Sequence, residues 1–214
     1  AGLSDGWVWT LHEDRDGRLW VATLDGGLNR FDPEQRRFDL FRPQSPPDGG
    51  QAAADTRAID SDSGPLWLGG SGGLRRIDRR SGQALDWPED DARALSARAA
   101  RVSALVADGA GGAFVASGRQ LGHWQADGRW QPVPIAETTR PLPISALHRM
   151  RDGTLWVGGE DGTLFWMPPG TDRLEPVAMP PGFRVSAVTA LASDADGRLW
   201  LGTFADGLWL LETD

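Results

Sequence analysis

A short aromatic motif that recurs at a nearly fixed interval constrains this chain more than any other feature. Its clearest copy is Asp194-Ala-Asp-Gly-Arg-Leu-Trp-Leu-Gly-Thr203. Equivalent copies place an aromatic ring at Trp20, Trp67, Phe114, Trp156 and Trp200, with steps of 47, 47, 42 and 44 residues between them. A repeat of that length indicates one supersecondary unit that the chain uses five times.

Each copy has the pattern of short consecutive antiparallel strands. An alternating apolar run such as Val188-Thr-Ala-Leu191 comes first, and its period of two is typical of a strand with one buried face. An Asp/Gly turn follows, in which glycines such as Gly64 and Gly197 can adopt the positive φ of a tight hairpin. The Leu-Trp strand returns, and third and fourth strands follow, as in 27–32 and 37–41 of the first copy. The sequence therefore predicts an all-β fold, a β-propeller built of five four-stranded blades.

The predicted blades form a single domain with approximate boundaries at 7–50, 51–96, 97–143, 144–184 and 185–214. The last blade is expected to lack its outer strand. A closed five-bladed ring and a fragment of a larger propeller both remain open as interpretations. Residues 88–101 alone have a helix-like pattern, with proline and acids early and arginine late.

The composition of the chain argues against several kinds of site and partner. The 214 residues include no cysteine, which excludes disulfides, cysteine metal sites and thiol catalysis. The net charge of -8 argues against nucleic acid as a partner, because phosphate binding needs a basic surface. No run of 18 apolar residues predicts a membrane span, and the first residues lack the pattern of a signal peptide. No cofactor is predicted.

The motif series resembles the two-component regulator propeller repeat, which makes up sensor regions of bacterial hybrid histidine kinases and some diguanylate cyclases. The first copy carries nearly all of the pattern, in Asp14, Gly17, Leu19, Trp20, Thr23, Gly26, Gly27, Leu28, Phe31 and Asp32. The resemblance covers most of the chain and is strongest in copies one, four and five. Copies two and three depart from it, because the turn before Trp67 is one residue shorter and Arg119-Gln-Leu121 replaces Gly-Gly-Leu.

The resemblance implies a non-catalytic, periplasmic or otherwise extracytoplasmic propeller that senses a ligand for a bacterial signalling receptor. Its implied partners are an unknown small molecule or glycan and the downstream signalling module of the same receptor, and a homodimer stays open. Two alternatives are a propeller enzyme of the lyase or glycosidase kind and a scaffold that binds only protein. No Ser-His-Asp set, paired carboxylates or histidine metal motif stands out, so no enzyme is predicted.

The candidate ligand-binding residues follow from propeller geometry. Connections between blades and the turns between second and third strands share one face, where such folds commonly bind ligands. The candidates on that face are Trp7, Arg57, Arg101, Arg119, Arg140, Glu160 and Arg184. A ring of arginines would bind an anionic or sugar-acid ligand by bidentate hydrogen bonds, with tryptophan as a stacking platform. The alternative is that these arginines are ordinary solvated loop residues.

Histidines and acidic turns raise the question of metal binding. His12 and His148 hold the same position in two repeats and could approach a channel ligand or a metal. Val106 and Ala192 hold that position elsewhere, which favours a packing site that tolerates imidazole. Turns such as 14–17 are rich in oxygen ligands, but they lack the glutamate of an EF-hand loop. Turn chemistry explains them better, so no metal site is predicted.

Overall fold

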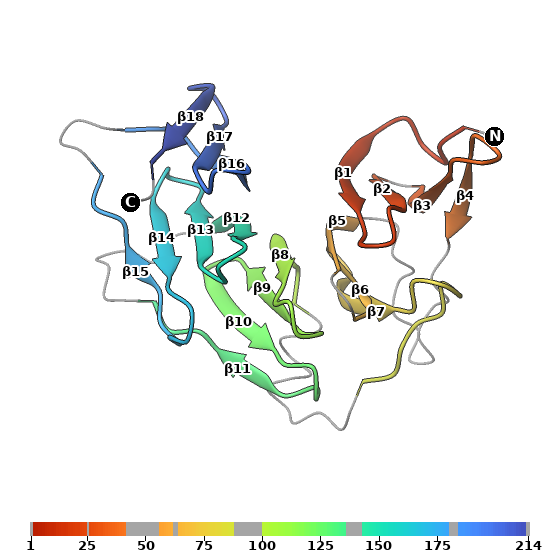
Figure 1. The fold of residues 1–214 in the computed structure, drawn as a ribbon, viewed down its shortest axis with the longest axis horizontal. Helices are drawn as coiled ribbons and strands as arrows, with labels where there is room; N and C mark the ends of the chain where they lie inside the picture. Colours follow the sequence, from red (N-terminus) through yellow and green to blue (C-terminus); the bar gives the residue numbers. More distant parts are fainter. Residues whose placement is uncertain are drawn as a thin grey trace. The chain divides into compact units, whose positions relative to one another are not determined.

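A computed structural model describes residues 2–24, 26–41, 56–61, 64–87, 100–135, 143–179 and 184–212. All secondary-structure elements in this part of the chain are strands, and they form five small antiparallel sheets. Figure 1 shows each sheet as a run of strands that follow one another in sequence. The predicted all-β fold of propeller blades is confirmed, with one sheet for each repeat. No described segment is a helix that could cross a bilayer.

Contacts divide the chain into two compact units. Unit 1 comprises residues 1–115 and 124–130, and unit 2 comprises residues 116–123 and 131–214. The first sheet, in unit 1, has the order β1 (Val8–Glu13), β2 (Leu19–Thr23), β3 (Gly27–Asp32) and β4 (Arg37–Phe41). The second sheet, also in unit 1, has the order β5 (Thr56–Asp60), β6 (Leu66–Gly70) and β7 (Gly73–Ile77).

The third sheet draws its residues from both units. Its strands are β8 (Ala104–Ala107), β9 (Ala113–Ser117), β10 (Gln120–Trp124) and β11 (Trp130–Pro132). The fourth sheet, in unit 2, comprises β12 (Ile144–Arg149), β13 (Leu155–Gly159), β14 (Leu164–Met167) and β15 (Glu175–Pro176). The fifth sheet, also in unit 2, comprises β16 (Val188–Ser193), β17 (Leu199–Thr203) and β18 (Leu208–Leu211).

The number of strands differs from the prediction in one sheet. The second sheet has three strands among the described residues, and the expected fourth is reduced to an isolated bridge between Ile77 and Ala84. The fifth sheet has three described strands, as predicted. The helix-like pattern at 88–101 lies almost entirely outside the described residues, because the description resumes at residue 100.

An irregularity of register recurs in the first strand of four sheets. It falls at Val8/Thr10, Thr56/Ala58, Ile144/Ala146 and Val188/Ala190. A β-bulge re-aims the side chains that follow it. Beyond it, His12 pairs with Trp20 and His148 pairs with Trp156, so the two histidines hold equivalent places in their sheets.

The hairpin between the first and second strands depends on glycine in most repeats. Gly17, Gly153 and Gly197 adopt φ of 73°, 97° and 83°, as the sequence predicted. Gly64 does not adopt a positive φ, which corrects that prediction for the second repeat. The physical reason is Pro65, whose ring restricts the preceding residue to extended conformations.

The core of each unit lies between successive sheets. In unit 1, Trp20, Ala22 and Leu28 form one buried cluster with Ile59, Leu66, Leu68 and Ile77 of the second sheet. A further cluster joins Ala58, Trp67 and Leu74 of the second sheet to Val102, Leu105, Ala113, Val115 and Trp124. In unit 2, Met150, Trp156 and Leu164 cluster with Leu199 and Leu201 of the fifth sheet. In these three repeats the motif tryptophan therefore packs against the next sheet, and its burial contributes up to about 4–6 kcal/mol.

Trp200 departs from this rule. It is only half-buried, and Leu208 and Leu210 beside it in the fifth sheet are 64% and 41% exposed. The fifth sheet therefore presents an apolar face that none of the described residues covers fully.

Candidate functional site

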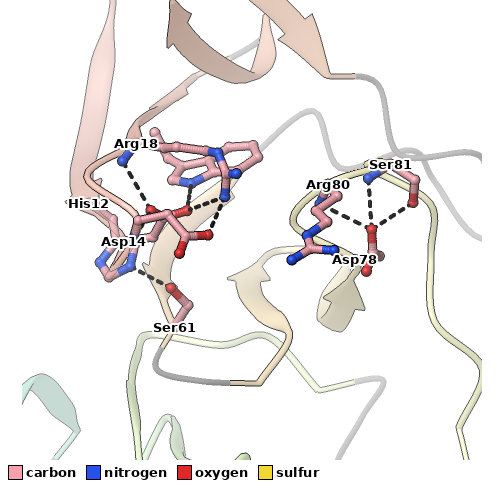
Figure 2. Close-up of polar contacts among 9 residues, drawn as sticks. His12, Asp14, Arg18, Ser61, Asp78, Arg80 and Ser81 are labelled. Carbon is pink, nitrogen blue, oxygen red and sulfur yellow. Dashed lines mark hydrogen bonds and ion pairs between the residues drawn. The ribbon is translucent and has the colours of Figure 1, made fainter.

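The aspartate that opens the first hairpin is a structural group. Asp14 is buried, and its Oδ1 accepts the backbone N–H groups of Asp16 at 2.9 Å and Arg18 at 3.0 Å. Its Oδ2 accepts the indole N–H of Trp20 at 3.0 Å. Burial alone would raise the pKa of Asp14, but these hydrogen bonds and the Arg18 charge hold that pKa below its ordinary value. Figure 2 shows Asp14 with Arg18.

The same arrangement recurs where the hairpin aspartate is present. Asp194 accepts the N–H groups of Asp196 and Arg198 at 3.0 Å each and the indole N–H of Trp200 at 3.0 Å. These contacts support the interpretation that the acidic turns hold their own backbone. Within the described ranges, no group of three or more histidine, aspartate or glutamate side chains is placed to hold a metal ion.

His12 ties the first sheet to the second. Its Nε2 lies 2.8 Å from the Ser61 hydroxyl (Figure 2). Its Nδ1 lies 3.4 Å from Asp60 Oδ1. Burial is the main cause that lowers the pKa of His12, and the charges of Asp60 and Asp14 oppose it. The other oxygen of Asp60 accepts the N–H of Ala107 in the third sheet at 2.9 Å. One polar chain therefore links three successive sheets within unit 1.

The order Ser61, His12, Asp60 is that of a nucleophilic triad, but two features indicate a structural role. Ser61 is buried, and the contact between Nδ1 and the carboxylate is too long for a good hydrogen bond. In unit 2, His148 Nε2 lies 2.9 Å from the Ser193 hydroxyl of the next sheet. The contact between a histidine Nε2 and a serine hydroxyl of the next sheet thus occurs twice. The imidazole therefore connects two sheets, whereas the sequence predicted only a packing site that tolerates it.

A separate polar group in Figure 2 closes the turn after β7. Asp78 Oδ1 accepts the N–H groups of Arg80 at 3.0 Å and Ser81 at 2.7 Å, and the Ser81 hydroxyl at 2.9 Å. The Ser81 hydrogen bonds lower the pKa of Asp78. These hydrogen bonds stabilise the turn and do not connect it to another strand.

A pocket in unit 2 is the candidate functional site. It has a volume of about 480 Å³, within the usual range for small-molecule sites. The turn between β13 and β14 contributes one side of the lining, and the described residues on either side of 180–183 contribute the other. The lining residues are Asp161, Gly162, Thr163, Leu164, Val177, Met179, Arg184 and Val185. We call this site the rim pocket.

Close backbone contacts hold the two walls of the rim pocket. A Cβ at Gly162 would lie 2.2 Å from the carbonyl oxygen of Val185, so only glycine allows the turn to approach this closely. On the far side of the connection, the Ser186 N–H donates to Asp206 at 2.6 Å, and the Phe204 N–H donates to the Ala187 carbonyl at 2.9 Å. Residues 185–187 are therefore fixed to both the fourth and the fifth sheet.

The structure distributes the sequence-predicted site residues over both units. Trp7, Arg57 and Arg101 belong to unit 1, and Arg119, Glu160 and Arg184 belong to unit 2. Arg140 lies outside the described residues. Only Arg184 lines the rim pocket, and Glu160 precedes Asp161 in the same turn. The ring of arginines at a channel mouth stays a prediction.

The remaining predicted residues have other surroundings. Trp7 is 74% exposed, and its carbonyl accepts the N–H of Leu24 at 2.9 Å. The Arg57 guanidinium lies 4.6 Å from the ring centroid of Trp9. Arg101 and Arg119 are exposed. Trp7 and Arg184 therefore do not share a site within one unit.

Sequence reasoning missed most of the rim pocket. Asp161, Gly162 and Thr163 follow the Trp-Val-Gly-Gly strand as a polar turn, which is a usable signal because the turn lies on the expected face. Val177 and Met179 carry no such signal, since single apolar residues in a connection are common on protein surfaces. Val177 and Met179 line the pocket only because of the path that the chain takes after β15.

A family model matches two stretches of this chain. Residues 2–25 and 182–205 match the model described as two component regulator propeller. A search of curated protein sequences finds no match.

Solved structures with a similar fold include two from B. thetaiotaomicron. The extracellular domain of BT4673, described as a putative one component system, is 19% identical with a TM-score of 0.71, over 97% of this chain and 26% of that one. The extracellular domain of the hybrid two component system BT3049, also described as putative, is 16% identical with a TM-score of 0.67, over 99% and 34%. The chain thus spans a quarter to a third of their length.

A propeller enzyme is similar to the same extent. Virginiamycin B lyase from Staphylococcus aureus is 13% identical with a TM-score of 0.67, and the match covers 97% of this chain and 70% of the lyase. At these identities the likeness shows the β-propeller fold and carries nothing about activity.

Proposed function

We propose, on the premise that this chain is built of two-component regulator propeller repeats, that it is a non-catalytic sensory module which binds a small ligand at the rim pocket. The module would lie outside the cytoplasm and pass the binding event to the signalling part of the same receptor. The premise rests on the matches at 2–25 and 182–205. The likeness to extracellular domains of one- and two-component systems supports the location.

The observation that carries the ligand-binding role is the construction of the rim pocket. Its walls come from a turn and an inter-sheet connection, the segments that vary without disturbing the sheets. Its volume suits a small molecule, and it combines an arginine with several apolar side chains. A scaffold that binds only protein would not need such a pocket.

A thermal-shift screen of the 214-residue chain tests this proposal. The panel contains neutral sugars, sugar acids, small carboxylates and divalent metals. A ligand present at 100 times its Kd should stabilise the folded state by about 2.7 kcal/mol, which raises the Tm by roughly 5–11 °C for a chain of this size. Absence of any shift across the panel would overturn the ligand-binding role and favour the scaffold alternative.

The lyase alternative needs its own measurement, because the similar virginiamycin B lyase makes it a specific second candidate. The chain is incubated with a streptogramin B antibiotic, and the antibiotic is followed by mass spectrometry. We expect it to remain uncleaved. Turnover of the antibiotic would replace the sensory proposal by an enzymatic one. This conclusion would hold even if the His12→Gln and His148→Gln variants retained the turnover.

A further inference from the structure

We infer that the rim pocket is selective for a monocarboxylate with a compact apolar body, and that Arg184 binds the carboxylate. This inference rests on the proposed function, since it names the ligand class of the same pocket. It also differs from the sugar-acid hypothesis, which assigned a stacking tryptophan to the site. None of the lining residues that the structure describes is aromatic.

The positive charge in the pocket is available for a ligand. Arg184 is exposed, and it forms no hydrogen bond or ion pair with any residue that the structure describes. An arginine guanidinium binds a carboxylate through two parallel N–H···O hydrogen bonds, a geometry that other anions match less well. Among the described lining residues, Arg184 alone is cationic.

The negative charge in the pocket is already engaged by its own turn. The Thr163 hydroxyl lies 2.6 Å from each oxygen of Asp161, and the Thr163 N–H donates to Asp161 Oδ1 at 3.0 Å. Thr163 therefore holds the Asp161 carboxylate in place within the turn. Its charge would repel a second carboxylate on the ligand, so dicarboxylates should bind more weakly than monocarboxylates.

Four of the eight described lining residues are apolar and would contact the apolar body of the ligand. Leu164, Val177, Met179 and Val185 supply branched or flexible apolar side chains, and Leu164 is buried. These side chains cannot satisfy the hydroxyl groups of a sugar acid, which would lose hydrogen bonds to water on entry. A short branched chain would instead gain from burial at about 0.8 kcal/mol for each CH₂ removed from water.

The three methionines of the chain make the inference measurable at the site itself. Met179 lines the rim pocket, whereas Met150 and Met167 are buried in the fourth sheet and its hairpin and do not line the pocket. A sample labelled with ¹³C at the methionine methyl groups therefore gives one reporter signal and two internal controls. Titration with 4-methylpentanoate should shift the Met179 signal to saturation and leave the other two in place.

Comparison of Kd values for matched ligands and protein variants separates the effect of the ligand's charge from that of its shape. The alcohol 4-methylpentan-1-ol, the dicarboxylate glutarate and the sugar acid glucuronate should each bind at least about tenfold more weakly than 4-methylpentanoate. Arg184→Gln should raise the Kd for 4-methylpentanoate at least about tenfold. Arg151→Gln removes an exposed arginine from the turn between β12 and β13, which does not line the pocket, and should leave the Kd unchanged. Unchanged Met150 and Met167 signals show that each variant is folded.

The outcomes distinguish this inference from the proposed function. If Met179 does not respond, if the alcohol binds as well as the acid, or if Arg184→Gln has no effect, the ligand class is wrong. A different ligand that raises the Tm without moving Met179 overturns the inference and leaves the sensory role standing. Saturable binding at Met179 with no response from a receptor that contains this chain keeps the site and overturns the sensory role.

Discussion

At the scale of single residues, the pair formed by the hairpin aspartate and the motif tryptophan links turn to core. Asp14 and Trp20 are joined by an N–H···O hydrogen bond of 3.0 Å, and so are Asp194 and Trp200. In the fourth repeat Met150 stands in place of the aspartate, and its sulfur accepts the indole N–H of Trp156 at 3.2 Å. The indole donor thus finds an acceptor even where the turn chemistry changes.

The two aspartate-bonded tryptophans provide a matched test of burial. Trp20 is fully buried, whereas Trp200 is half-buried, and their hydrogen bonds have the same length. Trp20→Ala should lower the free energy of unfolding by about 3–5 kcal/mol, because a large cavity remains. Trp200→Ala should cost less than half as much. Chemical denaturation of both variants checks this, and equal losses would mean that the hydrogen bond rather than burial decides the effect.

At the scale of elements, the closeness of successive sheets depends on a residue without a side chain. A Cβ at Gly69 would lie 2.4 Å from Val102 Cγ1, and one at Gly158 would lie 2.5 Å from Val188 Cγ1. In each case the glycine is two residues after the motif tryptophan, and the valine precedes or opens the first strand of the next sheet. The Trp-x-Gly pattern therefore sets the spacing between neighbouring sheets.

Gly158→Ala should destabilise the chain by about 1–3 kcal/mol, because the added methyl group overpacks the contact with Val188. Gly202 is the equivalent residue in the fifth sheet, and the nearest atoms to a Cβ there all belong to Ala190 of its own sheet, with Ala190 Cβ at 3.3 Å. Gly202→Ala should therefore cost much less. The thermal unfolding midpoints of the two variants test this. A larger loss at Gly202 would contradict the role given to the inter-sheet contact.

At the scale of the whole molecule, the titrating groups make stability depend on pH. The folded structure lowers the pKa of Asp14, Asp78, Asp127, Asp194 and Asp206, and that of His12. A group with a lower pKa in the folded state binds its proton more tightly when unfolded. Its contribution to stability is therefore present above the unfolded pKa and lost as the pH falls.

The unfolding midpoint should thus fall in two stages. His12 contributes the first, as the pH drops below its ordinary value of 6.5, and the aspartates contribute the second, below about 3.8. His12→Gln should flatten the first stage and Asp14→Asn should flatten the second. Asp16→Asn changes an exposed aspartate of the same turn and serves as the control. Denaturation between pH 3 and 8 measures all three, and a first stage that persists in His12→Gln would exclude His12 as its source.

Much of the fold could be predicted because its signals are local. The third strand at 27–32 and the fourth at 37–41 have the predicted bounds, since alternation and turn residues are properties of short segments. The turn at Gly64 was wrong because the effect of Pro65 was not weighed, although both residues are adjacent in the sequence. The histidine–serine ties were missed because their partners are 49 and 45 residues apart.

The candidate site could be predicted only in part. The expected face and Arg184 could be taken from the order of strands and connections, while the apolar lining depended on where the chain passes after β15. The arginines predicted to form one ring belong to two units, and the ring stays a prediction.

The sequence by itself determined the repeat, because a period of 42 to 47 residues with one ring, one acidic turn and one glycine pair in most copies allows only a small β unit stacked on its neighbour. Tertiary structure decided which tryptophans are buried, which histidines find a serine, and which loop residues enclose a pocket. These outcomes depend on distances between side chains far apart in the sequence, and such distances are set only when the sheets pack.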